Sequence, residues 1–218
     1  MGVALRFCKL MLAVGIVLTI AFVPANAAEM SKPVIVVLGD SLAAGLGLPE
    51  EQSFPAQLEN ALRTKGQNAK IANAGVSGDT AANGLARLDW AVPPETDAVI
   101  VEFGANDALQ GLPPEATKNA LEEILKRLRA KGLPVLLAGM EAPRNMGKEY
   151  VEEFRAVYRD LAARYSLVFY PFFLDGVALD ASLMQGDGLH PNAQGVAKIV
   201  DGILPKVEEL LAKIPPEG

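Results

Sequence analysis

The sequence has 218 residues, half of them hydrophobic, and its 26 acidic and 20 basic side chains give a net charge of −6. This length suits one domain with a proper core, and the negative charge disfavours nucleic acid or an anionic membrane surface as the main partner. The chain has one cysteine and one histidine, which excludes a zinc site of the usual Cys/His kind.

The first 27 residues predict a signal peptide. A short stretch with two basic residues precedes an uncharged apolar run at 10–23, and A-N-A at 25–27 has the small-x-small form of a signal-peptidase site. We expect cleavage after Ala27, a periplasmic or secreted protein and no stable membrane anchor after cleavage. The alternative is an uncleaved anchor, although a spanning helix needs about 20 apolar residues. Residues 28–218 then form a single domain with 18 basic and 26 acidic residues, a net charge of −8, and no cysteine.

From Pro33 onward, apolar runs typical of strands alternate with stretches of helical periodicity. Continuous apolar runs predict strands buried on both faces of a parallel sheet, at 34–38, 70–74, 97–104, 134–139 and 167–170. Apolar side chains at helical spacing predict helices after Pro55, at 115–131, at 149–165 and from about Asn192, a good N-cap. Five strands separated by helices predict an α/β sandwich around a mostly parallel sheet. Ligand sites in such sheets lie off the carboxyl ends of the strands.

Ser41 lies directly after the first predicted strand, where Gly39 permits a tight turn. A serine at this place can act as a nucleophile, and its backbone N–H can stabilise an oxyanion. The structural alternative is a helix N-cap. The nearby glycines fit neither a phosphate loop, because no Gly-Lys pair follows Gly39, nor a dinucleotide fingerprint, because the glycines at 45–47 open a proline-containing loop.

His190, the single histidine, favours the catalytic interpretation of Ser41. A serine hydroxyl is a weak nucleophile until a base takes its proton, and histidine titrates near neutral pH. Asp187 precedes His190 by three residues, a spacing that lets the carboxylate accept from Nδ1 and leaves Nε2 for the serine. The Asn106 side chain and the Gly78 N–H are candidate oxyanion donors, although Asn and Gly are also common turn residues.

Other conspicuous residues have structural interpretations. Asp40, Asp79 and Asp107 each follow a candidate site residue or its turn, and we expect them to bond backbone amides that fix those loops. Trp90 is interpreted as a core residue, with the rim of a pocket as the alternative.

Four motifs occur in one order over nearly all of the predicted mature chain: G-D-S-L (39–42), S-G-D-T (77–80), G-A-N-D (104–107) and D-G-L-H-P (187–191). In this combination the sequence resembles the SGNH branch of the GDSL hydrolases. Within that family it most resembles the small periplasmic multifunctional acyl hydrolases of the thioesterase I, lysophospholipase and arylesterase type. The resemblance implies a three-layer α/β/α, flavodoxin-like sandwich with a five-stranded parallel sheet in the order 2-1-3-4-5.

The resemblance also assigns roles within the site. It makes Ser41 the nucleophile, His190 the base and Asp187 the residue that orients the base. The oxyanion hole would consist of the Ser41 and Gly78 backbone N–H groups and the Asn106 side chain.

These assignments predict a serine hydrolase that cleaves carboxylic esters or thioesters through an acyl-enzyme, without a metal or an organic cofactor. The expected partner is a small-molecule acyl ester, thioester or lysophospholipid, and the default oligomeric state is a monomer. The apolar segment 108–114 is a candidate flap over the acyl chain, and we expect Leu109, Leu112 and Pro143 to contact the substrate.

Three alternatives to an ester or thioester hydrolase remain open at the level of sequence. A carbohydrate O-deacetylase of the same fold would reject acyl chains longer than a few carbons. An acyl transferase would share the first half-reaction. A non-catalytic binding module would keep the fold and be inert toward every activated ester.

Overall fold

The computed structural model describes residues 1–2 and 32–215. Apart from its first two residues, the predicted signal peptide lies outside the described residues, as does its cleavage site. Within the ranges that the structure describes, no helix is both long enough and apolar enough to cross a membrane.

Five strands form one sheet in which every neighbouring pair is parallel, in the order β2-β1-β3-β4-β5. The strands are β1 (Val34–Gly39), β2 (Lys70–Gly75), β3 (Ala98–Glu102), β4 (Val135–Ala138) and β5 (Val168–Tyr170). The sequence prediction of five strands and the strand order implied by the family resemblance are both confirmed.

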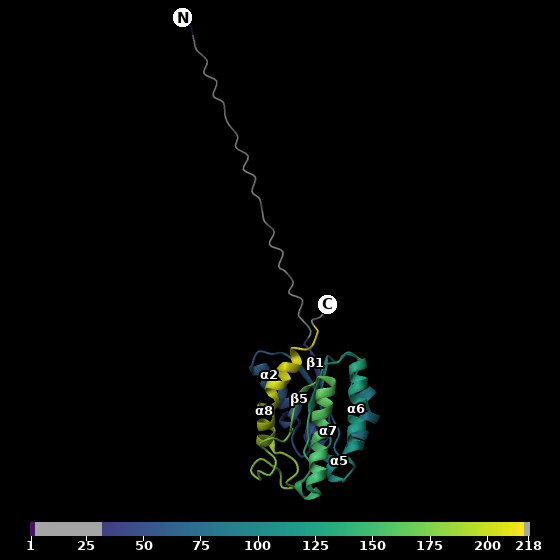
Figure 1. The fold of residues 1–218 in the computed structure, drawn as a ribbon. Helices are drawn as coiled ribbons and strands as arrows, with labels where there is room; N and C mark the ends of the chain where they lie inside the picture. The colour runs from purple at the N-terminus through teal and green to yellow at the C-terminus, as the bar shows by residue number, and fades with distance from the viewer. Residues whose placement is uncertain (3–31, 216–218) are drawn as a thin grey trace. The chain divides into compact units, whose positions relative to one another are not determined.

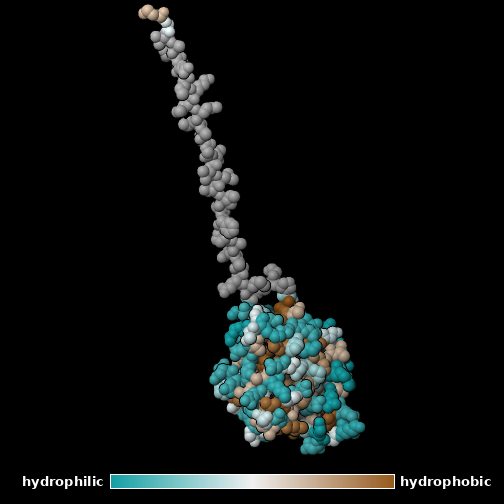
Figure 2. All heavy atoms as spheres, turned by 90° about the vertical axis from the view of Figure 1, so that its left-hand side faces the viewer, coloured by the Kyte–Doolittle hydropathy of each residue, from teal (hydrophilic) through white to brown (hydrophobic). Residues whose placement is uncertain are grey.

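Helices cover both faces of the sheet. Helices α2 and α8 pack together on one face, and α6 and α7 pack together on the other (Figure 1). The α-helices are α1 (Ser41–Ala44), α2 (Phe54–Thr64), α3 (Ala81–Ala86), α4 (Leu88–Ala91), α5 (Ala105–Leu109), α6 (Pro114–Ala130), α7 (Lys148–Tyr165) and α8 (Ala193–Leu211), and the 3₁₀ helices are η1 (Glu50–Gln52) and η2 (Arg144–Met146). On the side that faces the viewer in Figure 2, hydrophilic surface predominates and hydrophobic residues are scattered.

The four long helices agree with the periodicity of the sequence. Asn192 caps α8 as predicted, because its side chain accepts from the backbone N–H groups of Gln194 and Gly195 at 3.0 Å. Such a cap satisfies donors that have no acceptor within the helix. It also fixes the chain directly after His190.

The core lies between the sheet and its helices, and the central strands are buried on both faces. Every residue of β3 is buried, including Glu102 at its end, and five of the six residues of β1 are buried. This burial explains why both strands read as continuous apolar runs. The interpretation of Trp90 as a core residue is wrong: its side chain is 75 % exposed, because the short helix α4 buries Leu88 and Ala91 instead.

The end of β2 packs tightly against the first helix of the chain. A Cβ atom on Gly75 would lie 2.7 Å from Ala44 Cα and 2.8 Å from the Asp40 carbonyl oxygen. Only a residue without a side chain therefore lets α1 approach β2 this closely.

We predict that Gly75→Ala lowers the free energy of unfolding by about 1–3 kcal/mol, because the added methyl overpacks a backbone contact that cannot move alone. Gly186→Ala is the matched control, since a Cβ there meets nothing within 4 Å. Urea denaturation of the two variants and the wild type measures the effect. Equal stability of Gly75→Ala and wild type would show that α1 is free to shift.

Candidate active site

Three residues predicted from the sequence meet at the carboxyl edge of the sheet. Ser41 Oγ lies 2.9 Å from His190 Nε2, although 149 residues separate the two in the chain. On the other side of the ring, His190 Nδ1 lies 2.6 Å from Asp187 Oδ2. The imidazole is mostly buried, and Asp187 is partly open to solvent. This arrangement of hydroxyl, imidazole and carboxylate can remove the serine proton and stabilise the imidazolium that forms.

A tight turn holds the Asp187 carboxylate against the ring. Asp187 Oδ1 accepts from the backbone N–H groups of Leu189 at 2.9 Å and His190 at 3.0 Å, which leaves Oδ2 for Nδ1. The hydrogen bond with the His190 ring, followed by those two N–H groups, holds the pKa of Asp187 well below its usual range. Asp187 therefore stays ionised at neutral pH.

Gln185 ties the histidine turn to the loop that follows α1. Its Nε2 donates to the carbonyl of Leu46 at 2.7 Å and to that of Pro191 at 3.0 Å, and its backbone N–H donates to the His190 carbonyl at 2.7 Å. The sequence analysis missed this residue. Its position two residues before Asp187 is the one local signal that could have drawn attention to it.

Ser41 is the first residue of α1 rather than its N-cap. Asp40 occupies the cap position, and its Oδ1 accepts from the Leu42 N–H at 2.9 Å. The alternative interpretation of Ser41 as the capping residue is therefore wrong. The role predicted for Gly39 also changes: its backbone is not in the left-handed region, but a Cβ there would lie 2.6 Å from Glu102 Oε2 and 2.7 Å from Ala43 Cβ. Glycine is needed at this position for space.

The Asn106 side chain bridges two of the motif loops. Its Nδ2 donates to the Asp79 carbonyl at 2.9 Å and to Asp40 Oδ2 at 3.2 Å. Gly78 lies in the loop between β2 and α3 with a φ of +88°, a conformation that favours glycine. The Ser41 N–H is the first amide of α1, and such amides have no acceptor within their own helix.

The three aspartates expected to bond backbone amides do not all behave alike. Asp40 does so, and Asp107 accepts from the Ala81 N–H at 3.0 Å and from Thr117 Oγ1 at 3.0 Å. For Asp79 the expectation is wrong, because its carboxylate pairs with Arg87 Nε at 2.6 Å.

Two buried carboxyl groups lie directly beneath Ser41. Asp40 and Glu102 are both fully buried, and the Asp40 N–H lies 3.3 Å from Glu102 Oε2. Burial raises the pKa of Asp40 to about 6, and the Leu42 N–H opposes part of this rise. Burial, and then the charge of Asp40, raise the pKa of Glu102 well above its usual range. The site therefore favours a protonated Glu102.

The residues expected to contact the substrate lie on two neighbouring segments. Leu109 ends α5 and is about half exposed, and the Leu112 carbonyl accepts from Tyr150 Oη at 2.7 Å. Pro143 is half-buried and precedes η2. A Cβ on Gly111 would lie 3.5 Å from Met146 Cε, so the segment 108–114 runs alongside η2.

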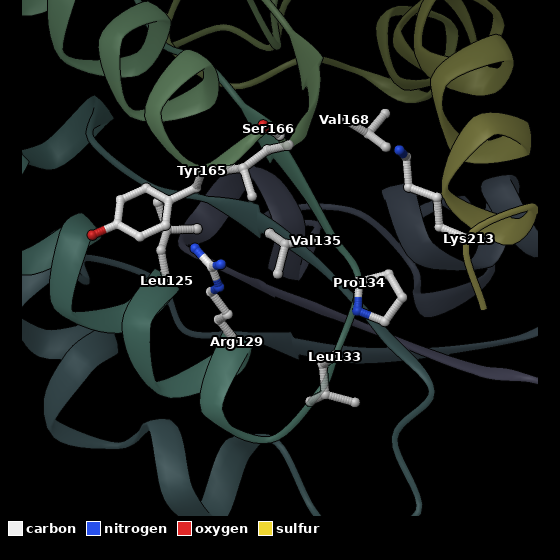
Figure 3. Close-up of a pocket in the computed structure, with 10 residues that line it drawn as sticks. Leu125, Arg129, Leu133, Pro134, Val135, Tyr165, Ser166, Val168 and Lys213 are labelled. Atoms are coloured by element: carbon white, nitrogen blue, oxygen red, sulfur yellow. The ribbon is translucent and has the colours of Figure 1, made fainter. Parts of the chain in front are cut away.

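A separate cavity of about 230 Å³ lies at the opposite edge of the sheet, where β4 and β5 begin. Figure 3 shows Arg129 and Lys213 on two sides of it, together with apolar side chains such as Leu125. None of the candidate site residues lines this cavity.

We predict that Glu102→Gln removes a pH dependence from the stability of the fold. Because the folded state raises the pKa of Glu102, the folded protein binds more protons than the unfolded chain above the unfolded pKa of about 4.3. The wild type therefore loses stability as pH rises through this window, by up to about 1.4 kcal/mol per pH unit.

Urea denaturation between about pH 5 and about pH 9 tests this prediction, because this range lies above the unfolded pKa of glutamate. The free energy of unfolding of Glu102→Gln should rise relative to the wild type as pH increases. Glu95→Gln, at an exposed position, is the control, and its difference from the wild type should stay constant. A constant difference for Glu102→Gln as well would contradict the prediction.

Comparison with known proteins agrees with this geometry. Residues 37–198 match the model of the GDSL-like Lipase/Acylhydrolase family. Esterase TesA of Pseudomonas aeruginosa is 37% identical over 184 residues, which cover 84% of this chain and 92% of the relative. Thioesterase 1/protease 1/lysophospholipase L1 of Escherichia coli strain K12 is 35% identical over 178 residues, which cover 81% of this chain and 84% of the relative.

A solved structure shares the fold as well as the sequence. The crystal structure of AlinE4, an SGNH-hydrolase family esterase, matches with a TM-score of 0.70 and 44% identity, over 83% of this chain and 97% of that one. The family match extends from β1 into α8, and it includes all four motifs that build the site. The chain belongs to the GDSL-like lipase/acylhydrolase family.

Proposed function

We propose that the protein is a serine hydrolase that cleaves carboxylic esters and thioesters through an acyl-enzyme. The observation that carries the proposal is the alignment of Ser41 Oγ, the His190 ring and the Asp187 carboxylate at 2.9 Å and 2.6 Å. Membership of the family, and relatives named as an esterase and as a thioesterase and lysophospholipase, support it.

In the proposed reaction, Ser41 Oγ attacks the acyl carbonyl carbon while His190 Nε2 takes the hydroxyl proton. Asp187 stabilises the imidazolium through Nδ1. The tetrahedral intermediate collapses when the leaving alcohol or thiol takes the proton from Nε2. A water molecule, deprotonated by the same nitrogen, then attacks the acyl-enzyme, and a second collapse releases the acid and restores the Ser41 hydroxyl.

We assign the oxyanion formed in both steps to three donors: the N–H groups of Ser41 and Gly78, and the Asn106 side chain. One Asn106 amide hydrogen is directed to the Asp79 carbonyl at 2.9 Å. The other makes the longer contact, 3.2 Å to Asp40 Oδ2, and it is the hydrogen available to a charged oxygen. The chemistry uses only side chains, backbone amides and water, so the proposal requires no cofactor.

The surroundings of the site support an apolar acyl group. The side chains of Leu46, Val76, Leu109 and Leu189 are between 39% and 52% exposed, and each lies within a few residues of a candidate site residue. We assign acyl-chain contacts to Leu109 and Leu112 in the flap segment 108–114, and to Pro143 beside it. The proposed substrates are small acyl esters, thioesters or lysophospholipids.

The proposal includes a compartment and an oligomeric state. The A-N-A pattern at 25–27 supports export, cleavage after Ala27 and a periplasmic or secreted enzyme. We propose a monomer, because the site is complete within one chain. N-terminal sequencing of the exported protein and its mass in solution test these two points.

We predict that Ser41→Ala and His190→Ala each lower kcat by about 10⁴–10⁶-fold, because nucleophile and base act as one unit. Hydrolysis of p-nitrophenyl esters measures the loss, with Glu95→Gln as an exposed control that should keep full activity. An active Ser41→Ala variant, or a folded wild type that is inert toward every ester, would refute the proposed function. Inert wild-type protein would favour a binding module.

The chain-length profile of the same assay identifies the substrate class. We predict that turnover continues from acetate to long acyl chains, because the exposed leucines and valine, which lie close in sequence to the candidate site residues, provide apolar surface for the chain. Turnover restricted to chains of about two to four carbons would instead indicate a deacetylase-type pocket. Product analysis with an added alcohol separates hydrolysis from acyl transfer.

We predict that Asn106→Ala lowers kcat by about 10²–10³-fold with a small effect on KM, because the lost donor acts mainly on the charged intermediate. Asn119→Ala, an exposed position on α6, is the matched control and should leave kcat unchanged. An Asn106→Ala variant with normal kcat would remove this residue from the oxyanion hole.

A further inference from the structure

Arg87 is a largely buried arginine that contacts two of the motif loops. It lies between α3 and α4, its side chain is 11% exposed, and its Cζ lies 5.9 Å from the centre of the Phe103 ring. Among the described residues, the buried Nη1 has no hydrogen-bond partner. Burial of a guanidinium, with one nitrogen unsatisfied, is costly, so stability alone gives no reason for this residue.

The first contact of Arg87 fixes the end of β1. Arg87 Nη2 donates to the Gly39 carbonyl at 2.9 Å, and the same oxygen accepts from the Val76 N–H at 3.0 Å. Gly39 is followed by Asp40, and then by Ser41 with its N–H at the start of α1. This carbonyl is therefore the point at which the serine turn, the 76–80 loop and the guanidinium meet.

The second contact fixes the loop that carries Gly78. Arg87 Nε donates to Asp79 Oδ2 at 2.6 Å, and the Asp79 side chain is only 14% exposed. A Cβ on Gly78 would meet nothing within 4 Å, so packing around Gly78 does not hold the loop. The Asp79 side chain is one anchor of the loop, and Asp79 shares a peptide group with Gly78.

The anchored Asp79 also holds the third donor. Its backbone carbonyl accepts from Asn106 Nδ2 at 2.9 Å, so the position of the Asn106 amide depends on the same residue. The Arg87 guanidinium thus acts on the Ser41 turn through Gly39. It acts on the Gly78 and Asn106 donors through Asp79.

The ion pair of Arg87 and Asp79 also changes the charge near the proposed oxyanion hole. Burial is the main cause that raises the pKa of Asp40, and the charges of Asp107 and Asp79 add to the rise, so carboxyl groups act on the loops that carry the proposed donors. The Arg87 guanidinium is paired with Asp79 and offsets its negative charge. Without that cation, a buried carboxylate would oppose the negative charge that develops on the substrate oxygen.

We propose that Arg87 is a positioning residue that fixes the relative positions of the Ser41, Gly78 and Asn106 donors. It does so through two hydrogen bonds, from Nη2 to the Gly39 carbonyl and from Nε to Asp79 Oδ2. The proposal rests on the serine-hydrolase function proposed above. It requires the shape of the guanidinium as well as its charge, because the single ammonium of a lysine cannot occupy the Nε and Nη2 positions together.

The test compares Arg87→Ala, Arg87→Lys and wild type, each purified from cells that express the full chain, with p-nitrophenyl butyrate as substrate. Loss of aligned donors should lower kcat of Arg87→Ala by about 10²–10³-fold and change KM by less than about threefold. Arg87→Lys, which keeps the charge, should still lose roughly tenfold or more in kcat. Arg159→Ala, an exposed arginine on α7, should match the wild type.

Chemical rescue separates positioning from a general loss of structure. Methylguanidinium can occupy the space left in Arg87→Ala, and it should restore kcat by roughly tenfold or more without affecting the wild type or Arg159→Ala. Rescue also shows that the variant is folded. If Arg87→Ala does not fold, the kcat of Arg87→Lys decides the question.

With an active wild type, a normal kcat of Arg87→Ala or of Arg87→Lys would overturn the role of Arg87 and leave the serine-hydrolase function standing. A folded Arg87→Ala that loses kcat without rescue by methylguanidinium would also overturn that role. A wild type that hydrolyses none of the esters and does not react with a fluorophosphonate would overturn the serine-hydrolase function, and the role of Arg87 with it.

Discussion

The pairing of β1 between β2 and β3 is the constraint on which the site depends. In this register Gly39 lies level with Gly75 on one side and with Glu102 on the other. Three of the loops that build the site therefore leave the sheet at one height. Parallel strands make this possible because their carboxyl ends share an edge, which an antiparallel sheet of the same strands would not provide. Two of these three strands end in glycine, at Gly39 and Gly75. The missing side chains let the Glu102 carboxyl and α1 approach the backbone.

The architecture followed from the sequence where burial is uniform. Strands covered by helices on both faces read as apolar runs, and the long amphipathic helices read as a 3.6-residue period, so both were predictable. Helices of four to six residues, such as α1 and α5, are too short to show a period, and the turns that hold them depend on contacts elsewhere in the chain. Trp90 was misjudged for a related reason: α4 is a one-turn helix, and it leaves this residue on its outer side.

The residues of the site likewise divide into those that the sequence predicted and those that it did not. Asp187 and His190 are three residues apart in one turn, so their pairing was readable from local spacing. Arg87 and Gln185 were not singled out, because each has a partner far away in the sequence: Gly39 lies 48 residues from Arg87, and Leu46 lies 139 residues from Gln185. Glu102 was hidden for a different reason. In the sequence it is one charged residue at the end of a strand, and its distinctive chemistry arises only from complete burial beside Asp40.

His190 follows Ser41 by 149 positions in the sequence, and this separation has a consequence for the synthesis of the chain. During synthesis Ser41 is made directly after β1, whereas His190 is made just before α8. Gln185 can bond the Leu46 carbonyl only after both regions have been made. A partly synthesised polypeptide that ends before His190 thus carries the proposed nucleophile without its proposed base. The contact between Ser41 and His190 therefore cannot form until the chain has been synthesised beyond residue 190.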